Sequence, residues 1–162
     1  MSANKYKPHV LILPEDDANR QIINGFLTDP AISRRAVQPL ENAGGWTQVI
    51  ANFLHNHVAI MQNNLNRYMI LVFDSDNAED RIAKVRAGIP ADVKDRVFIL
   101  TTLSKPEDLK RAGLGTFEEI GMRLATDCRN STRTTWDHSL LKHNADELDR
   151  MGSTIRLILF PQ

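Results

Sequence analysis

The chain has 162 residues, of which 42% are hydrophobic and 25% charged, values that are ordinary for a folded protein and that exclude extended disorder. Lysine plus arginine equals aspartate plus glutamate at 20 each, which excludes a protein that coats nucleic acid through bulk positive charge alone. The length fits one domain, 1–162, and no apolar run approaches the roughly 18 residues needed to span a bilayer. Cys128 is the single cysteine and cannot form an internal disulfide, and the N-terminus lacks an apolar signal core. We therefore expect a cytoplasmic protein.

The first half of the chain alternates between apolar runs typical of strands and amphipathic stretches typical of helices. Residues 9–14 form a continuous apolar run, as in a strand covered on both faces of a parallel sheet. A helix over 18–27 follows, capped by Asp16 or Asp17 and stopped by Asp29-Pro30. Next we expect a short strand, a Gly-rich turn, a helix and the clearest strand of the chain, at residues 36–40, 42–45, 46–62 and 68–73.

The second half begins with a short helix over 78–87 and a strand over 96–101. Ser104 and Pro106 then open a helix, because serine suits the capping position and proline an early helical position. Thr116 caps a longer helix. We expect that helix to end near residue 130. A loop, a further helical stretch and a closing apolar strand follow, at residues 132–136, 139–151 and 155–160 respectively.

The alternation of strands and helices predicts an α/β fold with a mostly parallel open sheet, helices on both faces and extra helices near the C-terminus, as in Rossmann-like proteins. Residues 104–152 form a mainly helical elaboration before the last strand in this prediction.

Acidic side chains follow two strands of the predicted sheet. Glu15, Asp16 and Asp17 come after the first strand, and Asp74 and Asp76 come after the third. Ligands of open parallel sheets bind at the carboxyl ends of the strands, so we expect these carboxylates to lie together. Carboxylates at that density repel one another unless a cation lies between them, and oxygen ligands suit Mg²⁺ or Mn²⁺. The plainer interpretation is that they are helix caps and solvated loop acids.

The pattern resembles the Toprim domain of bacterial primases, topoisomerases and OLD-type nucleases. That family has a Glu after its first strand, a Gly-rich turn after its second and an Asp-x-Asp after its third. Here Glu15, Gly44-Gly45 and Asp74-Ser75-Asp76 stand in those places, and the match covers residues 8–101. Asp16 follows Glu15 where the family often has glycine.

The resemblance implies a function and a set of roles. It implies a Mg²⁺-dependent nuclease or phosphoryl-transfer protein acting on nucleic acid, either DNA or RNA. Glu15 would be the general acid or base, with Asp74, Asp76 and Glu15 around Mg²⁺ or Mn²⁺. Because the net charge is zero, we also expect a partner protein, such as an ATPase, and the weak charge repulsion between copies favours a homo-oligomer.

Further candidate residues lie near these motifs or in the C-terminal part. Asp16 competes with Glu15 for its role, Glu107 is a candidate metal or substrate-positioning acid, and Lys105 a candidate phosphate contact. A first-turn glutamate that complements the helix dipole and a solvated surface lysine are the plainer alternatives. The candidate contacts to a nucleic-acid backbone are Arg123, Arg129 and Arg133.

A second function class is a non-catalytic module, either Toprim-like or similar to the receiver domain of response regulators. Receivers have two acids after strand one, a phosphorylated Asp after strand three and a Thr or Ser after strand four. Asp16-Asp17, Asp74 and Thr101 or Thr102 match that pattern, whereas Asp76 and the absence of a clear lysine after a fifth strand do not.

Overall fold

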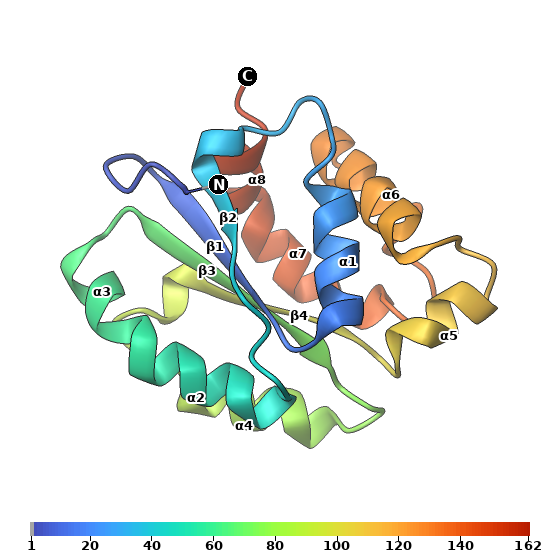
Figure 1. Ribbon diagram of the computed structural model, residues 1–162, viewed down its shortest axis with the longest axis horizontal. Coiled ribbons are helices and arrows are strands. Elements are labelled where there is room, and N and C mark those ends of the chain that lie inside the picture. The colour runs from blue at the N-terminus through green and yellow to red at the C-terminus, as the bar shows by residue number, and fades with distance from the viewer. Residues whose placement is uncertain (1) are drawn as a thin grey trace.

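The computed structural model describes residues 2–162, which build one sheet of four parallel strands in the order β2-β1-β3-β4 (Figure 1). The strands are β1 (His9–Pro14), β2 (Val37–Pro39), β3 (Arg67–Asp74) and β4 (Val97–Thr102). Ile12 lies opposite Ile70, and Leu71 lies opposite Ile99. The sheet confirms the predicted parallel α/β fold.

Successive strand residues point to opposite faces of the sheet, and both faces are covered. Leu11 and Leu71 belong to the apolar core on one face, and Ile12 and Ile70 to the core on the other. The first core packs against α2 (Trp46–Asn56), α3 (Val58–Asn63) and α4 (Glu79–Gly88). The second core packs against α1 (Asp17–Phe26), α6 (Phe117–Asn130), α7 (Ala145–Gly152) and α8 (Ile155–Leu159).

Helices α1 and α6 approach each other closely because each has a glycine at the crossing. A Cβ atom on Gly25 would lie 2.0 Å from the carbonyl oxygen of Glu118, and one on Gly121 would lie 1.9 Å from that of Ile22. A separate apolar cluster joins α6 to α5 (Pro106–Arg111) and to the segment after α6; its buried members are Leu109, Phe117, Ile120, Leu124, Trp136 and Leu141.

The prediction of a closing strand over 155–160 is wrong, because these residues form helix α8. Ile155 and Leu159 are buried one helical turn apart, whereas Leu157 between them is exposed. No strand follows β4 in the described chain, so the helical residues 104–152 come after the last strand rather than before it.

Several boundaries also differ from the sequence prediction. The helix expected over 46–62 divides at His57 into α2 and α3. Lys105 takes the capping position of α5, and the Ser104 hydroxyl donates to the Asp108 carboxylate at 2.6 Å. Thr116 caps α6, as predicted from the sequence, and forms a capping box with Glu119. The short 3₁₀ helices are η1 (Arg34–Ala36), η2 (Lys94–Arg96) and η3 (Lys142–Asn144). None of the helices within residues 2–162 has the length and apolar character to cross a membrane.

Candidate functional site

Three carboxylates meet at the carboxyl edge of the sheet, where β1 and β3 run side by side. Glu15 follows β1, Asp16 caps α1, and Asp74 is the last residue of β3. One oxygen from each lies within 4.8 Å of the others, and all three residues are half-buried. Oxygens bound to one Mg²⁺ at about 2.1 Å lie roughly 3 to 4 Å apart, so this spacing is close to that of a metal site. Carboxylate oxygens are also the type of ligand that suits Mg²⁺ and Mn²⁺, and Mg²⁺ usually takes one or two of them and keeps several waters.

Neighbouring groups hold the three carboxylates in place. The backbone N–H of Asp74 donates to Glu15 Oε2 at 2.8 Å. This hydrogen bond joins the carboxyl ends of β1 and β3 within the site. The buried Asn19 amide donates to Asp16 Oδ1 at 3.0 Å and to Asp74 Oδ1 at 3.3 Å. The Thr102 hydroxyl, at the end of β4, donates to Asp74 Oδ1 at 2.9 Å. The site is therefore built at the carboxyl ends of β1, β3 and β4 and at the start of α1.

Burial and mutual repulsion make the negative charge of this cluster unfavourable. Burial raises the pKa of Asp74 to about 7, and the charges of Glu15 and Asp16 act in the same direction. The hydrogen bonds from Thr102 and Asn19 oppose that rise. Burial also raises the pKa of Glu15, against the backbone hydrogen bond that it accepts from Asp74. A cation placed among the three oxygens would favour the charged forms.

The second acid of the Asp-x-Asp sequence lies outside this cluster. The Asp76 backbone is left-handed, with φ of 51°, and its exposed carboxylate lies 3.9 Å from the guanidinium of Arg81. Arg81 also donates to the backbone carbonyl of Asp74 at 2.8 Å and stacks over the Trp46 ring, 4.8 Å from its centroid. The structure thus brings together Glu15, Asp16 and Asp74. Asp76, which the sequence places in the metal site, contacts Arg81 instead of joining this group.

Comparison of the chain with models of known protein families, with curated proteins and with solved structures finds no match.

The other acid and the lysine that the sequence singled out lie near the same edge of the sheet but not in the cluster. Lys105 and Glu107 are exposed at the start of α5, just beyond β4. Of residues 2–162, only Glu15, Asp16 and Asp74 come together as a group of potential metal ligands.

The three candidate arginines for nucleic-acid contact do not form a free basic strip. Arg129 makes a two-pronged ion pair with the buried Asp29, at 2.8 Å to each oxygen. Arg133 pairs with Asp149. Arg123 is exposed on α6. Two of these three charges are therefore already matched by aspartates within the chain.

Sequence reasoning missed Asn19 and Arg81 and named Thr102 only for the receiver alternative. Asn19 lies three residues after Asp16, the spacing at which a capping side chain meets the first turn of its helix. Arg81 lies one turn into α4, seven positions after Asp74. Both signals depend on helix starts that a sequence locates only within a few residues.

Proposed function

We propose that this chain is a Toprim-type, Mg²⁺- or Mn²⁺-dependent phosphoryl-transfer protein that cleaves phosphodiester bonds in nucleic acid. The observation that carries the proposal is the grouping of the Glu15, Asp16 and Asp74 oxygens at the carboxyl ends of adjacent parallel strands. Ligands of this fold class bind at that edge.

The residues present suit distinct roles in such a reaction. Asp74 and Asp16 would hold the cation, which supplies charge stabilisation to phosphoryl oxygens when bound. Glu15 is the candidate proton carrier, because its raised pKa moves it toward the working pH of a general acid or base. Asn19 and Thr102 orient Asp74 through the two hydrogen bonds that its Oδ1 accepts.

A partner protein is part of the proposal. The net charge is zero, and Arg129 and Arg133 are paired with aspartates, so these two arginines are not free to bind a polyanion. A partner such as an ATPase would add positive surface for the nucleic acid.

The test is a cleavage assay with the purified chain. Supercoiled DNA, linear DNA, single-stranded DNA and RNA are incubated with Mg²⁺, Mn²⁺ or EDTA, beside Glu15→Gln and Asp74→Asn. Asp17→Asn is the matched control, because Asp17 lies next to the cluster but is exposed and outside it. We expect metal-dependent cleavage that is lost in the two cluster variants and kept in the control. Cleavage that is equal in all four proteins, or absent with every substrate and metal both for the chain alone and with candidate ATPase partners added, contradicts the proposal.

One observation favours a second candidate, a receiver-like signalling module. The Thr102 hydroxyl lies 2.9 Å from Asp74 Oδ1, where a receiver has a Thr or Ser beside its phosphorylated Asp. The absence of a strand after β4 in residues 103–162 argues against it, since a receiver has a lysine after a fifth strand. Incubation with acetyl phosphate and Mg²⁺ separates the two candidates: a phosphorylated species of wild type that Asp74→Asn lacks would favour the receiver.

A further inference from the structure

The guanidinium of Arg81 lies beside the acidic cluster and uses few of its hydrogen-bond donors. Its side chain is 19% exposed, and it donates one hydrogen bond to residues 2–162, to the Asp74 carbonyl at 2.8 Å. An arginine has five N–H donors. Arg96, another partly buried arginine, donates to three backbone carbonyls. Arg81 therefore keeps donors for an acceptor that approaches from outside the chain.

The loop between β3 and α4 turns Arg81 back toward the cluster. Asp76 and Asn77 have left-handed backbones, with φ of 51° and 57°. The Asn77 N–H donates to the Leu103 carbonyl at 2.6 Å, which fixes the loop against the end of β4. Arg81, in the first turn of α4, thereby reaches the last residue of β3. Its charge also acts on the cluster: burial raises the pKa of Glu15, and Arg81 is among the groups that lower it.

Trp46 holds the guanidinium of Arg81 in one plane. It is the first residue of α2, and the backbone N–H of Gly44, two positions earlier, donates to the Glu15 carbonyl at 2.9 Å. The guanidinium carbon lies over the Trp46 ring, 4.8 Å from its centroid, where α2 and α4 run side by side (Figure 1). Stacking of this kind covers one face of the guanidinium and leaves its edge, where the N–H groups lie, for an acceptor.

Asp76 is a weak competitor for that edge. Its carboxylate is 60% exposed and lies 3.9 Å from Arg81 Nη2, which is beyond hydrogen-bond distance. An ion pair as exposed as this contributes little, because solvent screens both charges. A phosphate group can form two parallel hydrogen bonds with one guanidinium, so it should displace the carboxylate.

We propose that Arg81 binds the scissile phosphodiester group of the substrate, and that Asp76 pairs with the guanidinium until the substrate displaces it. The inference rests on the function proposed above, which brings a phosphodiester to the adjacent carboxylates. In this arrangement the second acid of the Asp-x-Asp sequence restrains a substrate-binding arginine and does not hold the metal. The fixed plane of the guanidinium favours a two-pronged contact, which a lysine cannot make.

A dinucleotide tests this contact without a partner protein. The probe is two thymidines joined by one phosphodiester, titrated with Mg²⁺ into isotope-labelled Glu15→Gln protein, which lacks the candidate proton carrier. Its methylphosphonate analogue has a similar size but no charge at phosphorus. We expect the dinucleotide, and not the analogue, to give a saturable shift of the Arg81 Nε–H resonance, which is assigned by its loss in Arg81→Gln. That variant should bind the dinucleotide about tenfold more weakly, as for lost hydrogen bonds to a charged group.

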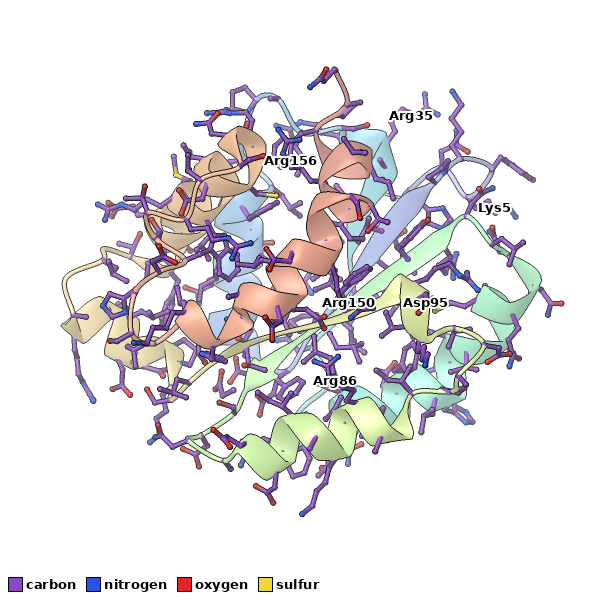
Figure 2. All side chains as sticks on the ribbon, turned by 180° about the vertical axis from the view of Figure 1, so that it is seen from behind. Lys5, Arg35, Arg86, Asp95, Arg150 and Arg156 are labelled. Atoms are coloured by element: carbon purple, nitrogen blue, oxygen red, sulfur yellow. The ribbon has the colours of Figure 1, made fainter. Side chains whose placement is uncertain are left out.

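Further variants in the same background separate a substrate contact from a structural one. Arg86→Gln is the matched control, because Arg86 lies farther along α4 (Figure 2) and is 52% exposed, and it should leave binding unchanged. Asp76→Asn should tighten binding about threefold, and should have little effect when Arg81→Gln is also present. Arg81→Lys keeps the charge without the planar fork, so it should lose less than Arg81→Gln, and it replaces that variant if Arg81→Gln fails to fold.

Stabilisation by Mg²⁺ in thermal unfolding distinguishes the failure of this inference from that of the proposed function. No saturable shift with the dinucleotide, or equal binding with and without Arg81→Gln, overturns the role of Arg81, whereas metal-dependent cleavage in the assay above would still support the proposed function. Loss of the stabilisation by Mg²⁺ in Arg81→Gln also overturns that role, because Arg81 would then support the metal site instead of the substrate. Wild type that neither cleaves nucleic acid nor is stabilised by Mg²⁺ overturns the proposed function, and the inference with it.

Discussion

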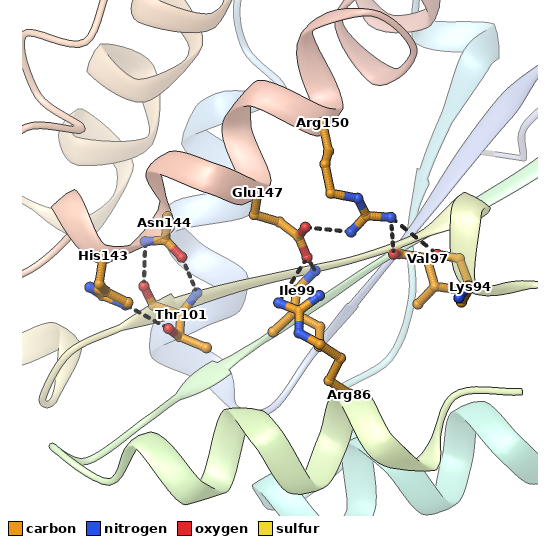
Figure 3. Close-up of polar contacts among 9 residues, drawn as sticks. All are labelled: Arg86, Lys94, Val97, Ile99, Thr101, His143, Asn144, Glu147 and Arg150. Carbon is orange, nitrogen blue, oxygen red and sulfur yellow. Dashed lines mark hydrogen bonds and ion pairs between the residues drawn. The ribbon is translucent and has the colours of Figure 1, made fainter. Parts of the chain in front are cut away.

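The Glu147 carboxylate accepts a hydrogen bond from the backbone N–H of Ile99 at 2.7 Å and so joins α7 to the free edge of the sheet (Figure 3). Asn144, one turn earlier, accepts from the Thr101 N–H at 3.0 Å and donates to the Thr101 carbonyl at 2.8 Å. An unpaired strand edge is a template for association with another chain. Side chains of α7 and of Asn144, which caps its start, thus pair the edge of β4 that another strand would otherwise occupy.

Glu147 is also the buried centre of an ion-pair group, and its removal should destabilise the fold. Its carboxylate is 5% exposed and contacts Arg150 and, at 3.5 Å, Arg86, both of which lie over this edge in Figure 2. Glu147→Ala leaves the buried Ile99 N–H without its acceptor, which should lower the free energy of unfolding by about 1–3 kcal/mol. The loss of the ion pairs adds little, because Arg150 and Arg86 are partly exposed and screened by solvent. Urea denaturation measures the change. Glu147→Gln keeps an acceptor for the Ile99 N–H, so its free energy of unfolding should fall by less than that of Glu147→Ala. Equal decreases in the two variants would show that the hydrogen bond to Ile99 contributes nothing to stability.

Asn144 predicts a separate effect on the sheet edge. Asn144→Ala removes both hydrogen bonds to the Thr101 backbone, so the Thr101 amide should exchange with solvent faster while the amides of β1 stay protected. The bare edge should also favour association, which sedimentation velocity detects as a concentration-dependent increase in size. Asn144→Asp is the control, because it keeps an acceptor for the Thr101 N–H. Unchanged exchange at Thr101 in the alanine variant would contradict this prediction.

The four strands and most helices could be predicted from sequence because continuous apolar runs and helical spacing are local signals. The end of the chain could not. The run at 155–160 suits a strand or a short buried helix equally by composition. The choice depends on Asn144 and Glu147, whose side chains pair the β4 edge, and on the fit of Ile155 and Leu159 against the sheet.

The candidate site, too, could be predicted from the sequence only in part. The position of Glu15 and Asp74 follows from strand ends in a parallel sheet, which a sequence predicts well. The direction of Asp76 does not follow, because it depends on a left-handed backbone and on Arg81, which offers its carboxylate a contact 3.9 Å away. Asn19 reaches Asp74 from α1 through a contact between residues 55 positions apart, which no local pattern encodes.

The raised pKa of Asp74 predicts how stability changes with pH in the absence of metal. The folded-state pKa is about 7, against an ordinary value of 3.8. Between these values the folded protein keeps a proton that the unfolded chain has lost. The unfolded chain is therefore favoured increasingly as pH rises from about 4 to about 7, and the full penalty holds above pH 7.

Urea denaturation of wild type and Asp74→Asn at pH 5 and pH 8 measures this penalty. The variant has no proton to lose, so its stability relative to wild type should be greater at pH 8 than at pH 5. Asp95→Asn, at an exposed position on η2, should show no such difference. A gap between Asp74→Asn and wild type that is the same at both pH values would count against a buried, raised-pKa carboxyl at this position.

The close crossing of α1 and α6 predicts a strong effect of one methyl group. Gly121→Ala places a Cβ 1.9 Å from the Ile22 carbonyl oxygen, so the helices must separate, and the loss should be about 3 kcal/mol or more. Gly152→Ala is the matched control, because nothing lies within 4 Å of a Cβ at that position, the last residue of α7. It should be neutral or stabilising by up to about 1 kcal/mol. Thermal unfolding compares the two, and similar transition temperatures would mean that the helices do not meet at Gly121.

Addition of Mg²⁺ or Mn²⁺ should stabilise the chain through the three carboxylates. A cation at a concentration of about 100 times its Kd stabilises a single-site protein by about 2.7 kcal/mol, which thermal unfolding detects readily. Asp16→Ala should remove most of that gain, because its oxygen is one of the three within 4.8 Å. Asp76→Ala should keep it, since that exposed carboxylate lies beside Arg81 instead. The comparison separates a metal site built on the Asp-x-Asp sequence from one built on adjacent strand ends. If Asp76→Ala alone lost the stabilisation by metal, Asp76 would have to turn into the cluster when the metal binds.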